Sequence, residues 1–541
     1  MESKDIELLA DLGYRQEFKR AFRPLEVFGL AFSVIGLFPA IASTLALSLP
    51  CGGPVALIWG WTVCGTFVMT VALSIAELSS AAPTAGGLYF WTFKYASPRW
   101  RYLLSWIAGY SNTMCGVAGM ASGTWALAVQ LMAAVSIGTN QEFIPTTGQI
   151  YALYVALFIV TAFAASFATQ TVAYLERVYM ALNILLCVAV IIALPISTPD
   201  EFKNPVSYVF GKFSNREHVL SALLHDINSG IKLSPLWVMS GYDAPVHMSE
   251  EASNAATAVP MAIVSALGCT AVLGLGLNIA LAFNMGKNVE SIMANPIGQP
   301  MATIFFNSFG TRGTLVVWTF IVLAQFSVCA SYLVACSRQM FAFSRDGALP
   351  FSRYVYRMNT HTQTPVICVW AVTFLALLLG LLAFAGPNAI NATFSLSVVG
   401  LYLTCGIPIG SRLLGPTTWI PGPFSLGKLS VPVAVVALVW CTFAIVIVMF
   451  PSMPDPTGLT MNYTVVVGGG WIGLCILYFY FPRYGGVHWF KGPMANISRD
   501  ASDRDATLQI ITESVTETKD EKYLQKAASS SGSSLRLGDT S

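Results

Sequence analysis

Charged residues and histidines are scarce in this sequence, and their scarcity limits the kind of protein it can form. Asp, Glu, Lys and Arg make up only 10% of the 541 residues, whereas soluble domains usually contain about 25%. Hydrophobic residues make up 55%. Runs of about 20 residues carry no charge, which is long enough to cross a hydrocarbon core of ~30 Å. A soluble protein is therefore excluded, and we expect an all-α integral membrane protein.

The sequence also lacks the signatures of metal centres, intramembrane enzymes and nucleic-acid-binding proteins. The 5 histidines form no His-x-x-x-His motif in any hydrophobic segment, as a metal centre or an intramembrane enzyme would require. The 11 cysteines occur singly, without a Cys-x-x-Cys pair, which is typical of small packing residues. No basic domain indicates nucleic-acid binding. We expect no catalytic residue, no metal, no cofactor and no nucleic-acid partner.

The hydropathy pattern predicts twelve transmembrane helices flanked by two polar tails. Residues 1–24 are interpreted as a cytoplasmic N-terminal tail, 25–482 as the membrane domain, and the Ser-, Asp- and Lys-rich remainder, 483–541, as a disordered cytoplasmic tail. The expected spans are 25–48, 54–78, 102–135, 147–168, 174–197, 219–250, 259–283, 313–343, 364–385, 389–411, 430–450 and 463–482.

The distribution of basic residues predicts the orientation. With the N-terminus inside, only six of the 29 Lys and Arg residues fall on the outer side. Cytoplasmic segments are expected to hold the excess of positive charge. Both termini are therefore predicted to be cytoplasmic.

Two of the expected spans contain helix-breaking residues. In the first span Gly36 and Pro39 bracket the middle, and in the sixth Gly241 and Pro245 bracket an acidic residue, Asp243. A broken helix is tolerated in a membrane only inside protein or around a cavity. Interruptions five spans apart are typical of inverted-repeat transporters. Repeat one is predicted at 25–197, repeat two at 219–411, and two peripheral helices at 430–482.

The direction of the chain predicts the electrostatics of these breaks. The second half of span one would present free amide groups around Ala40 to Ser43, which favour an anionic group. The first half of span six would end near Ser240 with free carbonyl groups, to which Asp243 adds a full negative charge. Amides on one wall and a carboxylate on the other suit a zwitterion or an organic cation.

Each of these residues also has a purely structural interpretation. Asp243 is suited to capping the helix that follows it, although a lone acid inside a membrane is a functional candidate by default. For Gly36 and Pro39 a simple kink is the alternative to a binding site. His247 is more often a structural histidine than a proton relay.

The same holds for the residues near the two ends of span six. Trp237 fits either ordinary packing or an aromatic gate. Glu250 and Glu251 fit a solvated helix end, with a closing salt bridge as the alternative.

Four motifs resemble the amino acid–polyamine–organocation transporters, and among them the fungal amino acid/choline permeases, over residues 12–482. They are FSVIGLFPAIAS in span one, AELSSAAPTAGGLYFW from Ala76, GYDAPVHMSEEASNAATAVPMAI from Gly241 and SRQMFAFSRDGALP from Ser337. The resemblance implies a LeuT-type fold of five plus five inverted spans with two peripheral helices, working by alternating access. It also implies that Trp237 is an aromatic gate and that Asp243 faces the amino group of the substrate.

The resemblance and the breaks together define the candidate site. Many bacterial members have a lysine within span five in place of a sodium ion, whereas this span has none, so the coupling ion stays open. We expect a proton, with sodium as the alternative. The substrate-binding candidates are Gly36, Phe38, Pro39, Ala40, Ile41, Ser240, Gly241, Tyr242 and Asp243, and the gate candidates are Trp237, Glu250 and Arg338.

The expected function is secondary active import of amino acids or related small amines, such as γ-aminobutyrate, across a fungal plasma membrane. A choline, organic-cation or polyamine permease is the alternative. Phe38, Tyr242 and Trp237 offer aromatic faces to such a cation. A channel or an intramembrane enzyme is a more distant possibility.

Overall fold

The computed structural model describes residues 2–18, 20, 22–167, 169–211, 233–450 and 462–496. The chain divides into two units, residues 17–494 and a smaller unit that combines residues 1–16 with 495–541. In the described part of the smaller unit, helix α1 (Glu2–Asp11) is followed by a loop that contains Gly13. The Gly13 O accepts a hydrogen bond of 3.0 Å from the Asn496 N–H, near the other end of the chain. No strand occurs among the described residues of either unit.

The described part of the larger unit consists of helices and the loops that join them. Its main helices are α2 (Pro24–Ile35), α3 (Leu37–Ser48), α5 (Trp61–Ala81), α6 (Gly87–Tyr95), α7 (Arg101–Gly138), α8 (Thr147–Phe167), α9 (Thr169–Ser197), α12 (Leu233–Val238), α13 (Ala244–His247), α14 (Ala255–Asn284), α16 (Pro300–Arg345), α18 (Val366–Gly380), α19 (Pro387–Leu414), α20 (Ser430–Met449) and α21 (Thr464–Phe479). Shorter ones are α4 (Gly53–Val55), α10 (Val206–Gly211), α15 (Val289–Met293), α17 (Ser352–Val355) and α22 (Gly486–Trp489).

These helices confirm a membrane protein with many spans. Within the described ranges, ten helical segments are long and apolar enough to cross a bilayer. They correspond to ten of the twelve expected spans. The sixth expected span is broken into α12 and α13, and its first part, 219–232, lies outside the described residues. The twelfth corresponds to α21, a shorter apolar helix.

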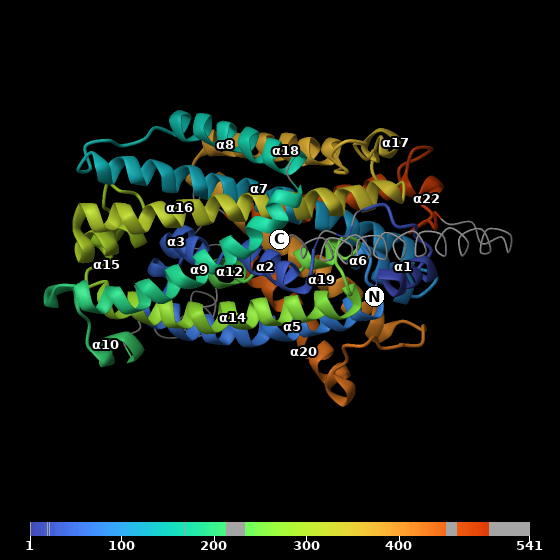
Figure 1. Ribbon diagram of the computed structural model, residues 1–541, viewed down its shortest axis with the longest axis horizontal. Helices are drawn as coiled ribbons and strands as arrows, with labels where there is room; N and C mark the ends of the chain where they lie inside the picture. Colours follow the sequence, from blue (N-terminus) through green and yellow to red (C-terminus); the bar gives the residue numbers. More distant parts are fainter. Residues whose placement is uncertain are drawn as a thin grey trace, which may run out of the picture. The chain divides into compact units, whose positions relative to one another are not determined.

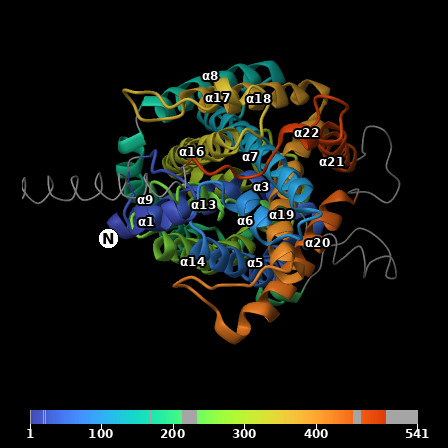
Figure 2. The same ribbon diagram turned by 90° about the vertical axis from the view of Figure 1, so that its right-hand side faces the viewer.

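The interrupted and small-residue-rich helices lie inside the bundle. Seen nearly along the helix axes, α7 and α19 are central, while α8, α18, α20 and α21 lie toward the edge (Figure 2). Helices α5 and α14 run side by side, as do α7 and α16 (Figure 1). A Cβ atom on Gly400 of α19 would lie 2.9 Å from Cys115 Cβ of α7. Glycine thus allows the close backbone approach that stabilises membrane helix pairs.

The folded unit continues past the last span. Residues 486–489 form α22, and Phe490 is buried against Trp106 with a ring separation of 5.3 Å. These residues fall in the segment that we expected to be a disordered tail from 483 onward. The rest of that tail, 497–541, lies outside the described residues.

Candidate functional site

The first break is confined to Gly36. Helix α2 ends there and α3 begins at Leu37, with Gly36 in the left-handed region at φ 55°. A Cβ at this position would meet Val328 Cγ2 of α16 at 2.1 Å. The backbone conformation and the close neighbour therefore both require glycine.

The second break spans several residues. The chain from Met239 to Asp243 is not helical, and Gly241 has φ 84°. A Cβ on Gly241 would lie 2.7 Å from Val34 Cγ1 of α2. The two breaks predicted by the sequence thus lie close together inside the bundle.

The backbone N–H groups from Ala40 to Ser43, which we expected to lack helical hydrogen bonds, lie within helix α3. Ala40 N–H donates to Gly36 O at 2.9 Å, because α3 starts three residues earlier than we expected. Pro39 does not break the helix; it lies in the first turn, where proline is tolerated since the first amides have no helical partner. The expectation of free amides from Ala40 to Ser43 is therefore wrong for this conformation.

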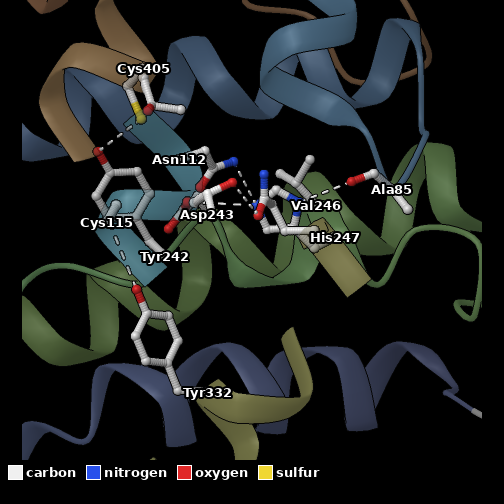
Figure 3. A network of polar contacts seen from close by, with 12 residues as sticks. Ala85, Asn112, Cys115, Tyr242, Asp243, Val246, His247, Tyr332 and Cys405 are labelled. Atoms are coloured by element: carbon white, nitrogen blue, oxygen red, sulfur yellow. Dashed lines mark hydrogen bonds and ion pairs between the residues drawn. The ribbon is translucent and has the colours of Figure 1, made fainter. Parts of the chain in front are cut away.

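Asp243 is buried at the start of α13 but does not cap it. Its side chain is 8% exposed and accepts no capping hydrogen bond, although Pro245 follows in the first turn. Its Oδ2 lies 3.9 Å from His247 Nε2 (Figure 3). The capping role that a structural interpretation would give Asp243 is absent, and the carboxylate is buried inside the bundle beside an imidazole.

His247 is held by two hydrogen bonds that fix its ring. Nδ1 lies 2.9 Å from Ala85 O, and Nε2 lies 3.1 Å from Asn112 Nδ2 (Figure 3). Because a carbonyl oxygen only accepts, Nδ1 carries the hydrogen, and Nε2 of the neutral ring accepts from the amide. The lone pair of Nε2 is therefore directed at the Asn112 amide, and Asp243 Oδ2 lies 3.9 Å from the same nitrogen.

A small cavity lies between the two breaks. Its volume is about 30 Å³, and its lining includes Val34, Ala40, Gly119, Trp237, Ser240 and Tyr332. About 10–15 Å³ is needed for one water molecule by this measure, so the cavity holds roughly two. An amino acid enters only when the surrounding helices move apart.

Asp243 lines a second, smaller cavity of about 10 Å³ together with Asn112, His247 and Gln339. Tyr332 borders both cavities and stands between them. Tyr332, Asn112 and Gln339 were not among the residues we predicted. Asn112 could have been identified from the sequence as a candidate, because it is a polar amide within an otherwise apolar helix.

The predicted site residues separate into two groups. Ala40, Ser240 and Gly241 line the central cavity, and Asp243 lines its neighbour. The others point elsewhere: Phe38 packs against Phe305, Pro39 O accepts from Gln130, Ile41 lines a different cavity, and Tyr242 donates to Cys405 Sγ.

Two buried ion pairs close one end of the bundle. Arg345 binds Glu250 through two bonds of 2.9 and 3.0 Å, and Arg338 Nε donates to Glu251 Oε1 at 2.8 Å. The glutamates are 1% and 4% exposed, so the expectation of a solvated helix end is wrong, and the alternative of a closing salt bridge holds. Glu250 and Arg338, both predicted as gate residues, are paired with other partners rather than with each other.

Neighbouring segments add to this closure. Asp346 accepts from Tyr89 OH at 2.7 Å, and the Ala85 N–H donates to Glu250 at 3.1 Å. The N-terminal segment also lies here, since Phe22 N–H donates to Glu251 O and Phe22 O accepts from Ser253. The charge-assisted bonds at this end are well protected from water, which strengthens them.

Trp237 borders the central cavity near the end of α12. Its ring centre lies 4.9 Å from that of Phe394, and its Nε1 donates to Ser122 Oγ at 3.3 Å. It is 8% exposed. The position is consistent with an aromatic group that covers the cavity, which was the predicted gate role.

Comparisons with known proteins agree with this architecture. The family model described as amino acid permease matches residues 22–471. A GABA-specific permease of Saccharomyces cerevisiae is 36% identical over 508 residues, covering 92% of this chain and 87% of that protein. An uncharacterized amino-acid permease of Schizosaccharomyces pombe is 34% identical over 498 residues, covering 92% and 90%.

A plant relative extends the same similarity. An amino-acid permease of Arabidopsis thaliana is 30% identical over 516 residues, covering 92% of this chain and 97% of that protein. The chain is a membrane transport protein, not an enzyme, and it belongs to the amino acid permease family of the amino acid–polyamine–organocation superfamily.

Proposed function

We propose that this permease imports amino acids or related small amines, with γ-aminobutyrate as the leading candidate, across the plasma membrane by proton-coupled alternating access. The observation that carries the proposal is Asp243, a buried carboxylate that caps no helix and lies at the break between α12 and α13. A membrane-buried acid is costly to keep unless it has a function. The name of the Saccharomyces cerevisiae relative supports γ-aminobutyrate within this class.

The amine of the substrate would approach Asp243 from the central cavity. Tyr332 stands between the two, so its side chain must move for the ammonium group to reach the carboxylate. The substrate carboxylate would then lie near the break at Gly36, where the first amides of α3 have no helical acceptor. An amino acid with separated charges fits this arrangement.

Choline is less well supported. Its recognition relies on aromatic faces around the quaternary ammonium. Of the three aromatic residues suggested for this role, Trp237 lines the central cavity, whereas Phe38 and Tyr242 contact Phe305 and Cys405 instead. The carboxylate-free cation would also leave the amides at the start of α3 unused.

The closed conformation fits one state of an alternating cycle. With both termini cytoplasmic, the Glu250–Arg345 and Glu251–Arg338 pairs would form the cytoplasmic gate. Trp237 would cover the substrate from the other side. Neither the 30 Å³ cavity nor its neighbour is large enough for an amino acid, so this conformation would be an occluded state of the cycle.

Uptake in yeast that lacks its own permeases tests the proposal. Labelled γ-aminobutyrate, choline and a panel of amino acids are offered while external pH and sodium are varied. We expect saturable uptake of γ-aminobutyrate or another amino acid that rises as external pH falls. Asp243→Asn is expected to lower it about 10- to 100-fold, because a charge-assisted hydrogen bond contributes about 1.5–3 kcal/mol.

Asp200→Asn is the matched control, since the Asp200 side chain is 95% exposed and its bond to Lys203 is at the surface. Surface expression of both variants is measured in parallel. Wild-type uptake by the Asp243→Asn variant would refute the site. Uptake of choline alone would show that the proposed substrate class is wrong. Dependence on sodium without any response to pH would show that the coupling ion is sodium and not a proton.

A further inference from the structure

An apolar groove lies on the outside of the bundle between α7, α19 and α20, and we call it the α19–α20 groove. Its volume is about 440 Å³, which falls within the range of ligand sites, about 300–1,000 Å³. Helix α19 packs against both α7 and α20, and α20 lies toward the edge of the bundle (Figure 2). The groove shares no lining residue with the central cavity. It therefore faces the bilayer and is separate from the substrate site.

The groove begins at one end of the bundle and reaches about the middle of the membrane. At its mouth lie Ser97, Trp100 and Leu414, where α7 begins and α19 ends, and at its deep end lie Tyr402 and Ile445. Leu414 and Tyr402 are twelve residues apart on α19, which is about 18 Å along a helix. One leaflet of the hydrocarbon core is about 15 Å thick. The groove thus has the depth of an acyl chain in a single leaflet.

Positive charge gathers at the mouth of the groove. Lys94, Arg99 and Arg101 lie directly beside the mouth residues in the sequence. The two segments that build the groove, 82–138 and 387–449, contain no Asp or Glu. A surface with charge of one sign attracts ligands of the opposite sign. The mouth therefore favours an anion.

Two of these cations are held by aromatic rings. The Arg99 guanidinium lies 5.2 Å from the ring centre of Trp100, which itself lines the groove. The Arg101 guanidinium lies 4.8 Å from the ring centre of Phe93 and 5.0 Å from that of Tyr102. Arg101 Nε is buried and has no hydrogen-bond partner within the described ranges. Contact with a ring face positions an arginine without using all of its N–H donors, so donors remain for a phosphate group.

A hydroxyl group without a partner lies just inside the mouth. Ser411 lines the groove about one turn before the end of α19 and is 7% exposed. In the part of the chain that the structure describes, its Oγ has no hydrogen-bond partner. A buried hydroxyl in this state is unfavourable unless a ligand supplies the missing bond. The ester oxygens of a phospholipid lie just below its phosphate, at the depth of this serine.

A second groove of similar size lacks the charge. It has a volume of about 360 Å³ between α9 and α14, and its lining includes Lys203. The Lys203 ammonium is paired with Asp200 at 2.9 Å. An acyl chain fits such a groove, but its cation already has a counter-charge. The mouth of the α19–α20 groove, and not the hollow alone, therefore indicates the ligand.

We propose that the α19–α20 groove binds an anionic phospholipid of the cytoplasmic leaflet, with an acyl chain along α19 and the phosphate beside Arg99 and Arg101. Basic pockets between transmembrane helices on the cytoplasmic side are typical sites for anionic headgroups. The leaflet rests on the proposed cytoplasmic position of the termini; the site itself does not depend on the proposed substrate. Because α7 and α19 also line the central cavity through Gly119 and Ser397, the lipid stabilises helices that surround the substrate site.

Binding is tested on the purified full-length chain, without a transport assay. Phosphatidylserine, phosphatidylcholine or cholesterol is added in detergent, native mass spectrometry counts the retained lipids, and thermal unfolding measures stability. We expect one tightly retained phosphatidylserine and a higher unfolding temperature with it than with either neutral lipid. Equal retention of the neutral lipids would overturn the inference, as would a dimer that retains no lipid.

A headgroup without chains and the transport assay separate the remaining explanations. Glycerophosphoserine carries the same phosphate but no acyl chain, and it should neither bind nor stabilise the protein. Stabilisation by it equal to that by phosphatidylserine would show a simple phosphate site and overturn the inference. A chain that retains phosphatidylserine but carries no amino acid would refute the proposed function and leave the lipid site intact.

Arg99→Gln combined with Arg101→Gln removes charge from the mouth. We expect phosphatidylserine to bind about 10- to 100-fold more weakly, because hydrogen bonds between charged groups are lost. Arg353→Gln combined with Arg357→Gln is the matched control, since both arginines are exposed, lie near α17 at the same end of the bundle as α6 (Figure 1), and do not line the groove. Unchanged binding in the Arg99 and Arg101 variant would overturn the inference.

Thr442→Trp fills the groove without changing its charge. Thr442 is exposed, lines the groove and donates through Oγ to Leu438 O at 3.0 Å. Thr319→Trp is the matched control, because Thr319 is also exposed and donates to Leu315 O at 2.8 Å but does not line the groove. Unfolding in phosphatidylcholine verifies that both variants are folded. We expect loss of phosphatidylserine from Thr442→Trp alone; equal retention by the two variants would overturn the inference.

Discussion

The imidazole Nδ1 of His247 lies 2.9 Å from the carbonyl oxygen of Ala85. The N–H of the same alanine donates to Glu250 Oε1 at 3.1 Å. One residue between α5 and α6 therefore contacts both the histidine next to Asp243 and the ion pair with Arg345. A displacement of His247 would move a group that holds Glu250, so these contacts connect the proposed substrate site with the proposed gate.

Replacing this histidine should weaken that route. His247→Asn shortens the side chain and leaves Ala85 O or Asn112 Nδ2 without its partner, at a cost of about 1–3 kcal/mol. We expect the maximal uptake rate to fall about tenfold, with a smaller change in KM. His361→Asn, at an exposed loop histidine, serves as the control. An unaltered rate in the His247 variant would show that the Ala85 contact does not participate in opening.

The pairing of Glu250 with Arg345 and of Glu251 with Arg338 can be measured by double-mutant cycles. Because both ion pairs are buried, removing one partner should destabilise the purified protein by about 3–5 kcal/mol. Glu250→Gln combined with Arg345→Gln should cost less than the sum of the two single changes, and so should Glu251→Gln combined with Arg338→Gln. Thermal unfolding in detergent gives the four stabilities of each cycle.

Crossed combinations provide the control for these cycles. Glu250→Gln with Arg338→Gln removes one partner from each pair, so the two effects should add. Strong coupling in the crossed combination, with additivity in the direct ones, would contradict the pairing described above.

The break at Gly36 should tolerate no side chain. Gly36→Ala meets two penalties: a left-handed backbone costs about 1–2 kcal/mol for a residue with a Cβ, and the new atom clashes with Val328 Cγ2. We expect loss of uptake, partly restored by Val328→Ala, which removes the contacting methyl group. Gly138→Ala is the control, since a Cβ there meets no atom within 4 Å.

Uptake kinetics and surface expression are measured for all of these glycine variants. Full activity of Gly36→Ala would mean that the α2–α3 break is not needed during transport. Failure of Val328→Ala to restore any activity would assign the whole effect to the backbone conformation.

Trp237 should affect retention of substrate more than folding. Trp237→Ala removes the ring that covers the central cavity and packs on Phe394, and we expect KM to rise about tenfold, since loss of an aromatic contact costs about 0.5–1.5 kcal/mol beyond its buried area. Trp237→Phe keeps a ring there and should stay within about threefold. Trp100→Ala, at a tryptophan 46% exposed, is the control. Equal KM values for the two Trp237 variants would refute a covering role.

The helices could be predicted from the sequence because one physical requirement dominates them. A segment that crosses a bilayer must be apolar over its whole length and must satisfy its own backbone. The predicted span 102–135 and the helix Arg101–Gly138 differ by a few residues at the ends. The same requirement made the breaks at Gly36 and Gly241 visible. The division into two inverted repeats stays a prediction.

The partners across the site could not be predicted in the same way. Glu250 binds Arg345, 95 residues away, and Glu251 binds Arg338, 87 residues away; nothing in the local sequence distinguishes this pairing from the crossed one. Tyr332 borders both cavities although it lies in an apolar helix with no unusual neighbours. Pro39 was misleading because proline is usually a sign of a broken helix, whereas a proline in the first helical turn does not interrupt the helix.

The short helix α22 and the burial of Phe490 against Trp106 bear on how the protein is best tagged and shortened. A fluorescent protein or affinity tag joined directly after residue 482 would remove Phe490, whose ring packs in the buried cluster formed with α7 and α21. A fusion joined after residue 496 leaves that packing complete. Expression vectors for purification, and truncations meant to remove degradation signals, should therefore keep the chain through this point.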